Sequence, residues 1–378
     1  MHKPPLLSYS LCCLLLTQAL GIAADRTVKI TPLGSRTGEL CIRDVALLFE
    51  DPSGVRILYD PGITVAGGTD PRLGDVHVIL VSHFHFDHIG DRKLADNPDA
   101  PTARCDAPLN TMRTENSNTA EIAAAKNSAV LAGYPMHVFL GRKIANIRGT
   151  PTPACPGTIN GEPAVGLFNE MIVPRTSPCQ GHMSFGTRTT VTRSAGTPGV
   201  RIAMVHAQHD DTIAGPIITE SLRTPLTENG LDGGYGGSPN GYVLTFTNGL
   251  KVYLSGDTGQ TSDMLNVVHR FYAVNLAVIN MDGAFVMGPE EAEFAVRSLI
   301  QPQAVIVSHV SEAATVNGAV QPGTRTSRFL ELLPDFPVFL PISGRTMEFD
   351  GDANCVAGCA MPPGPARRSP STPRKSVQ

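Results

Sequence analysis

One pattern occurs four times in this sequence: an apolar run stops and is followed at once by His or Asp. The four segments are VILVSHFH (78–85), IAMVHAQH (202–209), VYLSGD (252–257) and AVIVSH (304–309). Apolar, β-branched runs of this length predict buried strands. Side chains at strand ends are held rigidly and converge at one edge of a sheet, where α/β proteins build their sites. The pattern therefore predicts an α/β protein with its functional site at a sheet edge.

The first of these segments leads into a dense cluster of metal-capable side chains: His83, His85, Asp87 and His88. His83 and His85 are two residues apart, so at the end of an extended strand they face the same way. Asp87 and His88 follow in a turn that is predicted to begin a helix, and they aim at a second point. Imidazole and carboxylate groups suit zinc, iron and related ions. A cluster with two directions suits two metal ions about 3.5–4 Å apart.

The cluster alone cannot complete two metal sites, so the other ligands must come from distant parts of the chain. The best candidates are the residues that end the other apolar runs, namely His209, Asp257 and His309. His206 is expected to pack against its strand, with support of a metal ligand as the alternative. His182 is expected to have a surface role, with a substrate contact as the alternative.

On these motifs the sequence resembles the metallo-β-lactamase-fold hydrolases. The resemblance covers about residues 28–349 and is carried, in this order, by SHFHFDH, AQHD, SGDTG and SHV. It implies an α/β (α+β) fold, a four-layer αβ/βα sandwich of two mixed β-sheets flanked by helices. The ligands it implies are His83, His85 and His209 for the first metal, Asp87, His88 and His309 for the second, and Asp257 as a bridge.

A closer resemblance is to the branch that contains L-ascorbate-6-phosphate lactonase-like proteins and N-acyl-phosphatidylethanolamine phospholipase D. It rests on YLSGDTG (253–259) and INMDGAFVMGPEEA (279–292). The sequence departs from this branch in the long stretch between His88 and His209. β-Lactamases typically lack an Asp at the position of Asp257, so the bridging Asp favours the lactonases and phosphodiesterases.

The resemblance implies an enzyme that uses two divalent metal ions, with zinc expected and manganese or iron as alternatives. A metal-bridged hydroxide would attack an ester, lactone or phosphodiester in a small-molecule substrate. Asp257 would hold the metals apart and pass a proton to the leaving group, and Asp87 would orient the hydroxide. Tyr235 and Tyr242 are candidate oxyanion donors, although packing is the favoured interpretation. The alternatives are a mononuclear-iron oxidoreductase, a β-lactamase and a non-catalytic binding protein.

Charge and composition argue against a nucleic-acid partner and against a stable membrane span. The formal net charge is −4 over 378 residues, which argues against a nucleic-acid partner because such proteins present a basic face. Beyond the N-terminus, no apolar segment reaches the roughly 20 residues that a membrane span needs. The sequence gives no indication of the oligomeric state.

The N-terminus predicts export. Lys3 precedes an apolar stretch over about residues 11–20, and small residues offer a cleavage point near Ala23 or Ala24. This is the organisation of a Sec-type signal peptide, so residues 1–24 are predicted to be removed and the mature protein to be periplasmic or secreted. A membrane anchor is one alternative, and a lipoprotein through a cysteine of the apolar stretch is another.

The rest of the chain is predicted to be one hydrolase domain over residues 25–350 and a disordered tail over 351–378, rich in Pro, Ser and Arg. Within the domain, residues 149–198 are dense in Gly, Pro, Ser and Thr, which predicts an irregular insertion with possible short strands over one face of the core. Helices are expected at 89–96, 119–133, 288–300 and 326–333, and Asn248–Gly249 predicts a two-residue hairpin turn.

Six cysteines lie outside the predicted signal peptide: Cys41, Cys105, Cys155, Cys179, Cys355 and Cys359. An even number in an exported chain permits disulfides, and six cysteines allow 15 complete pairings. A bond between Cys155 and Cys179 would close a loop rich in Pro and Gly, and one between Cys355 and Cys359 would close a small ring. Buried free thiols are the alternative.

Overall fold

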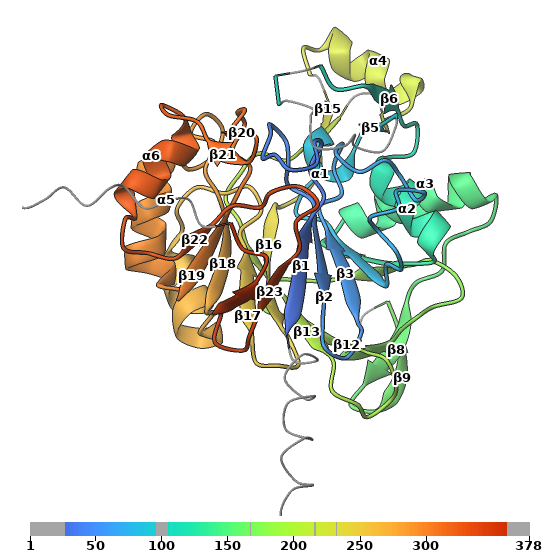
Figure 1. Ribbon diagram of the computed structural model, residues 1–378. Coiled ribbons are helices and arrows are strands. Elements are labelled where there is room, and N and C mark those ends of the chain that lie inside the picture. The colour runs from blue at the N-terminus through green and yellow to red at the C-terminus, as the bar shows by residue number, and fades with distance from the viewer. Residues whose placement is uncertain are drawn as a thin grey trace, which may run out of the picture.

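Two large mixed β-sheets face each other, and helices cover their outer faces (Figure 1). The computed structural model describes residues 27–95, 105–106, 108–166, 168–214, 217–231 and 233–360. The predicted signal peptide at 1–24 and the segment 361–378 lie outside these residues. The predicted four-layer αβ/βα sandwich is confirmed.

The first sheet contains β1 Val28–Pro32, β2 Leu47–Glu50, β3 Arg56–Tyr59, β4 Val78–Leu80, β7 Ala129–Ala132, β11 Cys179–His182, β23 Met347–Phe349 and β24 Cys355–Ala357. The second contains β8 Pro156–Ile159, β9 Glu162–Val165, β10 Glu170–Ile172, β12 Arg188–Thr192, β13 Val200–His206, β16 Asn240–Thr245, β17 Lys251–Leu254, β18 Leu276–Asn280, β19 Ala304–Ser308 and β22 Val338–Phe339. Their orders are β11-β7-β4-β3-β2-β1-β23-β24 and β22-β19-β18-β17-β16-β13-β12-β10-β8-β9.

Three short pairs complete the strands: β5 Arg92–Leu94 with β6 Thr111–Arg113, β14 Thr212–Ala214 with β15 Gly233–Tyr235, and β20 Thr315–Val316 with β21 Ala319–Val320. The helices are α1 Phe86–Ile89, α2 Asn118–Lys126, α3 Met136–Arg148, α4 Glu220–Glu228, α5 Pro289–Phe294 and α6 Arg325–Leu332. Two π-type segments, η3 Met264–Tyr272 and η4 Ala295–Ile300, are also helical.

Both faces of each sheet are apolar because both are covered. Successive strand residues point to opposite faces. In β3, Ile57 therefore points into the core between the sheets, and Leu58 points into the core beneath α2 and α3. In β18, Val278 enters the core between the sheets and Ile279 the core beneath the α5 and α6 layer. This double burial explains why the strands that carry the site appear in the sequence as continuous apolar runs.

The parallel strands of the two sheets decide where the site lies. In the first sheet β3, β4, β7 and β11 run parallel, and in the second β17, β18, β19 and β22 do so. The chain leaves each group at its carboxyl ends, which lie at the edge that also carries α1 (Figure 1). We call this the site edge. Loops that follow the two sets of strands meet there.

The segment 149–198 contains short strands, as was predicted to be possible, but they belong to the two sheets and do not lie over one face of the core. It contributes β8, β9, β10 and β12 to one end of the second sheet, while β11 forms the edge of the first. A disulfide joins Cys155 to Cys179 across it. Its Gly and Pro residues mark frequent turns between very short strands, which is why its composition resembled that of a loop.

The boundary of the predicted disordered tail also requires correction. β24 pairs with β23, and Cys355 is bonded to Cys359. Residues 351–360 therefore continue the first sheet, because an edge strand there satisfies the backbone groups of β23. A third disulfide joins Cys41 to Cys105.

The helix predicted at 89–96 is wrong, and the helix predicted at 119–133 is too long. After His88, α1 ends at Ile89 because Gly90 adopts a positive φ of 74°, and β5 follows. The predicted helix 119–133 stops at Lys126, and Ala129–Ala132 forms a buried strand between β4 and β11. Parallel pairing on both sides outweighs the helix propensity of alanine. The helices predicted at 288–300 and 326–333 are confirmed.

The predicted hairpin at Asn248–Gly249 forms between β16 and β17. The Phe246 N–H donates to the Leu250 carbonyl at 2.9 Å, so three residues rather than two make the connection.

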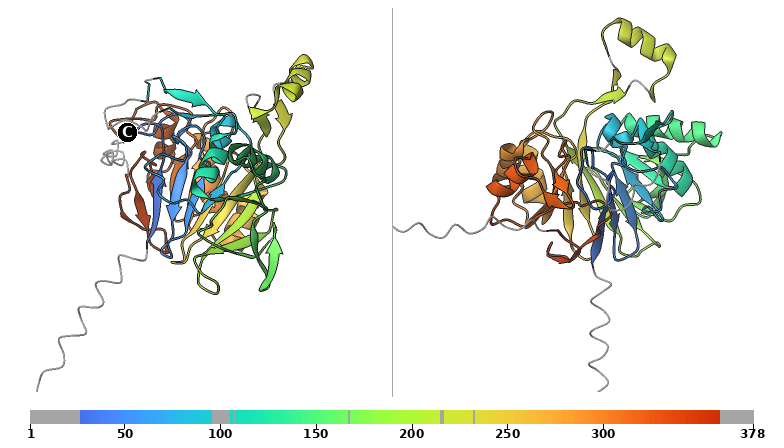
Figure 2. Two further views of the ribbon diagram at one scale, coloured as in Figure 1. Left: turned by 90° about the vertical axis from the view of Figure 1, so that its right-hand side faces the viewer. Right: turned by 45° about the horizontal axis from the view of Figure 1, so that its top comes forward.

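Helix α4 stands apart from the rest of the fold. Together with β14 and β15 it extends away from the two sheets (Figure 2), and none of its residues is buried. Within the described part of the chain, no helix is long and apolar enough to cross a membrane.

Candidate metal centre

The turn after β4 presents the first four candidate ligands. His85 begins the short helix α1, and its carbonyl accepts the N–H groups of His88 and Ile89 at 3.0 Å. Gly62 supports the turn from below, because its N–H donates to the His88 carbonyl at 2.9 Å. Gly62 has a positive φ of 51°, and a Cβ at this position would lie 2.1 Å from the Asp87 carbonyl oxygen. Only glycine allows this close approach.

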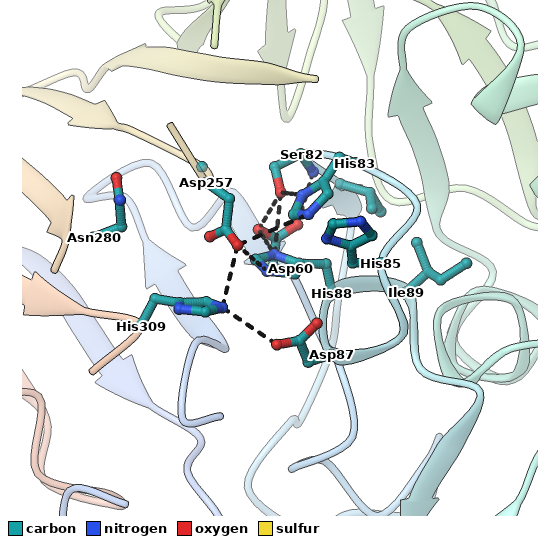
Figure 3. A network of polar contacts seen from close by, with 12 residues as sticks. Asp60, Ser82, His83, His85, Asp87, His88, Ile89, Asp257, Asn280 and His309 are labelled. Carbon is teal, nitrogen blue, oxygen red and sulfur yellow. Dashed lines mark hydrogen bonds and ion pairs between the residues drawn. The ribbon is translucent and has the colours of Figure 1, made fainter. Parts of the chain in front are cut away.

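The loops that follow strands of the second sheet supply the other three candidate ligands. His209 follows β13, Asp257 follows β17 and His309 follows β19, all at the site edge. Gly256 precedes Asp257 with a positive φ of 60°, and a Cβ there would lie 2.7 Å from the Asn240 carbonyl oxygen. His309 itself has a positive φ of 47°. Figure 3 shows His309 and Asp257 facing Asp87 and His88 across the junction of the sheets.

The structure brings all seven predicted side chains together, in two groups. Within each group, one ligand atom of each residue lies within 4.8 Å of the others. The groups are His83, His85, His209 and Asp257, and then Asp87, His88 and His309.

Asp257 belongs to the first group and also reaches the second. Its Oδ2 lies 3.2 Å from His309 Nε2 and 3.4 Å from His88 Nε2. The same oxygen lies 3.8 Å from His209 Nε2 and 3.9 Å from His83 Nε2. This carboxylate therefore stands between the two groups.

Asp60 is a buried member of the site that the sequence reasoning missed. Its Oδ2 is 2.8 Å from His88 Nδ1 and accepts the Ser82 hydroxyl at 2.7 Å, and its Oδ1 accepts the Ser82 N–H at 2.8 Å (Figure 3). The bond to Nδ1 leaves Nε2 of His88 directed to the cluster. The signal was present, since Asp60 directly follows the apolar run of β3. The Pro and Gly after it suggested only a turn.

Asp211 is a second missed residue. Its Oδ1 accepts the N–H of Phe84, the residue between His83 and His85, at 2.7 Å. Burial raises the pKa of Asp211 to about 7, although the bond from Phe84 opposes this shift. The side chain thus fixes the backbone between two candidate ligands. No local feature distinguished it from the neighbouring Asp210.

The three imidazoles of the first group are held neutral. Burial, with neighbouring histidines, lowers the pKa of His83 well below its ordinary value. Burial and His209 lower the pKa of His85 to about 4. Burial also lowers the pKa of His209. Neutral imidazole is the form that binds a metal ion.

The second group is a charged network. Burial opposes protonation of His88, but the carboxylates of Asp257 and Asp60 outweigh it and raise the His88 pKa. The pKa of His309 is raised in the same way by Asp257 and Asp87, against burial. Burial likewise opposes ionisation of Asp87, but the hydrogen bond from His309 lowers its pKa. The carboxylates thus require positive charge beside them, which a divalent cation would supply.

Several buried atoms of the cluster point to a metal ion. His83 Nε2, His88 Nε2 and Asp257 Oδ1 are buried and have no hydrogen-bond partner. A buried polar atom without a hydrogen-bond partner destabilises the fold, so these atoms are expected to bind something. Of the seven side chains, four come from the first sheet and three from the second. Nitrogen and carboxylate donors in this number fit two ions of the zinc type.

A cleft of about 730 Å³ opens beside the centre. Its lining includes Gln208, His209, Asp210, Gln260, Phe285 and Glu291. His209 belongs to both the cleft and the first group, so a molecule in the cleft would lie against the metal centre.

The other histidine and tyrosine candidates lie elsewhere. Tyr242 is fully buried and donates to the Val81 carbonyl at 2.7 Å, which confirms its packing interpretation. Tyr235 lies 77% exposed on β15. His182 is half-buried and stacks on His137 at 4.9 Å between ring centroids. His206 is exposed and packs edge-on against Phe185 rather than a candidate ligand.

A two-sheet sandwich with paired His and Asp donor groups at its edge is the arrangement expected of metal-dependent hydrolases. The family described as the β-lactamase superfamily domain matches residues 43–309, and the chain belongs to this family. It is a metal-dependent hydrolase of the metallo-β-lactamase superfamily.

Relatives of the chain bear names of the same class. It is 28% identical over 293 residues to a UPF0173 metal-dependent hydrolase of Cupriavidus necator, covering 76% of this chain and 78% of that protein. A UPF0173 metal-dependent hydrolase of Cupriavidus metallidurans is 28% identical over 289 residues, covering 75% and 76%. Among solved structures, the metallo hydrolase Igni18 of Ignicoccus hospitalis has a TM-score of 0.47 at 19% identity, covering 86% of this chain and 99% of that one.

Proposed function

We propose that the chain is an exported hydrolase that uses two divalent metal ions to cleave an ester, lactone or phosphodiester. The observation that carries this proposal is the position of Asp257, whose Oδ2 lies within 3.4 Å of both His88 and His309 while the residue also belongs to the first group. A carboxylate shared by two donor groups suits two ions rather than one.

The residues divide the work of holding the ions. His83, His85 and His209 would hold the first, and Asp87, His88 and His309 the second, with Asp257 between them. Zinc is the ion that this set of nitrogen and oxygen donors favours, with manganese and iron as alternatives. When bound, two such ions supply a water of lowered pKa and positive charge for the developing oxyanion.

Asp257 and Asp87 carry the proton and orientation roles. Asp257, which stands between the two donor groups, would take a proton from the attacking water and return it to the leaving group. Asp87 lies beside His309 in the second group, and its carboxylate would accept a hydrogen bond from the attacking water and so orient it. Asp60 keeps His88 in one tautomer and orientation through Nδ1.

The test combines metal content with turnover in the mature chain. Wild type is expected to hold two zinc or manganese ions and to hydrolyse at least one of a lactone, a phosphodiester and an aryl ester. Asp257→Ala is expected to lose bound metal and to lower turnover at least 100-fold, because losing a ligand should exceed the roughly 10–100-fold effect of losing a residue that only supports one. Glu162→Gln, an exposed change on β9, serves as the control.

A single iron with oxygen uptake would instead support the mononuclear oxidoreductase. Hydrolysis that survives removal of metal would contradict the proposal. A preference for β-lactams in the same screen would point to the β-lactamase alternative.

Export is a separate part of the proposal. The three disulfides are the bonds expected of a protein that folds in an oxidising compartment. N-terminal sequencing of the protein recovered outside the cytoplasm is expected to begin near residue 25. An intact N-terminus on cytoplasmic protein would contradict export.

A further inference from the structure

The cleft beside the metal centre has an acidic and aromatic lining. Asp210 and Glu291 are both exposed within it, and Phe285 is 78% exposed. None of the described residues that line this cleft is lysine or arginine. A group that enters it meets two carboxylates and an exposed benzene ring.

The neighbouring arginine does not cancel this charge. Arg325 lies close to Gly283 at the cleft wall. Its guanidinium is 3.6 Å from Oδ1 of the buried Asp282, so the two charges balance each other. Asp210 and Glu291 therefore retain a net negative charge in the cleft.

Phe285 and Glu291 lie on backbone that is held by hydrogen bonds. The loop that carries Phe285 is closed by the Gly283 N–H, which donates to the Met287 carbonyl at 3.0 Å. Glu291 accepts the Gly288 N–H through Oε2 at 3.1 Å, at the start of α5. Such preorganised groups bind a ligand at low cost in conformational entropy.

We propose that the substrate carries a cationic ammonium group, which lies in this cleft against Phe285 and between Asp210 and Glu291 while its scissile bond meets the metal centre. The proposal rests on the hydrolase function proposed above and narrows its substrate class. Aromatic faces attract cations, most strongly quaternary ammonium groups. An anionic group in the same place would be repelled by both carboxylates.

The sharpest probes are choline and 3,3-dimethylbutan-1-ol, which have the same shape but differ in the charge of the branched centre. Each is titrated into the zinc-loaded mature chain, and binding is followed by calorimetry or NMR. Choline is expected to bind about tenfold more tightly, from one cation–π contact and two partly exposed ion pairs. This advantage is expected to shrink as salt is raised.

Variants test whether the cleft causes the tighter binding of choline, which we call the choline advantage. The double variant Asp210→Asn/Glu291→Gln is expected to reduce the choline advantage about fivefold, and Phe285→Leu is expected to reduce it independently. Glu162→Gln, which removes one carboxylate on β9 at the other end of the second sheet, is expected to leave the advantage unchanged. Equal binding of the two probes, no binding of either, or an advantage that survives the double variant would overturn the proposal.

Turnover separates this proposal from the one on which it rests. Acetylcholine and 3,3-dimethylbutyl acetate are compared as substrates of the same zinc-loaded chain. A larger kcat/KM for acetylcholine supports the cationic cleft. If choline binds selectively and neither ester is cleaved, ester hydrolysis fails while the cationic cleft stands. If both esters are cleaved equally and choline shows no advantage, hydrolysis stands and the cationic cleft fails.

Discussion

His88 shows how one side chain is prepared as a ligand. Its Nδ1 is 2.8 Å from Asp60 Oδ2, and its Nε2 is buried without a hydrogen-bond partner. The bond on one side of the ring decides the direction of the other. The chemistry of the site thus depends on a residue that does not itself belong to either donor group.

Replacement of Asp60 tests this dependence. Asp60→Ala is expected to weaken zinc affinity about 10–100-fold, because His88 loses the partner that orients it. A competition assay with a chelating dye measures this. Asp51→Ala is the matched control, since Asp51 is also buried and accepts the Thr247 N–H at 2.8 Å, but at the edge opposite the site. Unchanged affinity in Asp60→Ala would show that Asp60 has only a packing role.

His77 precedes β4 at the end away from the site, and it is expected to make the free energy of unfolding depend on pH. Burial and then Arg193 lower the pKa of His77 to about 4, and its Nδ1 accepts the Arg56 N–H at 2.9 Å. The unfolded chain binds a proton at His77 below about pH 6.5, whereas the folded chain does not. The free energy of unfolding therefore falls as the pH drops from about 6.5 towards 4.

Urea unfolding at pH 7 and pH 5 measures this contribution. His77→Gln keeps a hydrogen-bond acceptor but does not titrate, so its stability is expected to fall less between the two pH values than that of wild type. The two proteins should differ in this fall by less than the uptake of one whole proton at His77 would give, because solvent partly reaches the imidazole. An equal fall in both proteins would contradict the pKa shift.

At the scale of elements, the segment 149–198 joins the ends of the two sheets. β11 completes the first sheet beside β7, and β12 joins the second beside β13. The Cys155–Cys179 disulfide spans 24 residues of this segment. The crosslink is expected to stabilise these short strands by restricting the unfolded chain.

Removal of this disulfide is expected to cost about 3 kcal/mol of unfolding free energy, through the entropy of the unfolded chain. Cys155→Ala/Cys179→Ala is compared with Cys355→Ala/Cys359→Ala by denaturant unfolding. The second bond spans only 4 residues, so its loss is expected to cost less. Equal losses would contradict an origin in chain entropy.

At the scale of the whole molecule, the metal centre lies where the two sheets meet. One sheet supplies four of the seven side chains and the other supplies three. Ions held there would tie the sheets together, so binding and folding are linked.

Free zinc at about 1,000 times its Kd is therefore expected to raise the free energy of unfolding by about 4 kcal/mol over the chelator-treated protein. Thermal or urea unfolding with and without zinc measures this. Asp257→Ala is the control and is expected to show a much smaller gain. A gain of the same size in this variant would place the stabilising zinc elsewhere.

Much of the site could be predicted from local sequence. The strand-end positions of His83, His209, Asp257 and His309 follow from apolar runs that stop at a metal-capable residue, and this signal is short-range. Asp60 and Asp211 were not predicted as site residues, because their roles depend on contacts to His88 and to the Phe84 N–H, which are distant in sequence.

The sequence by itself determined the buried strands and the seven candidate ligands, because periodicity and residue chemistry are local properties, and its resemblance to a known family implied the layered α/β class. Only the tertiary structure decided that Ala129–Ala132 is a strand, that residues 149–198 extend both sheets, and that residues 351–360 close an edge. In each case the backbone hydrogen bonds of a distant strand outweighed local propensity or turn-rich composition. The same long-range pairing placed Asp210, Phe285 and Glu291 around one cleft.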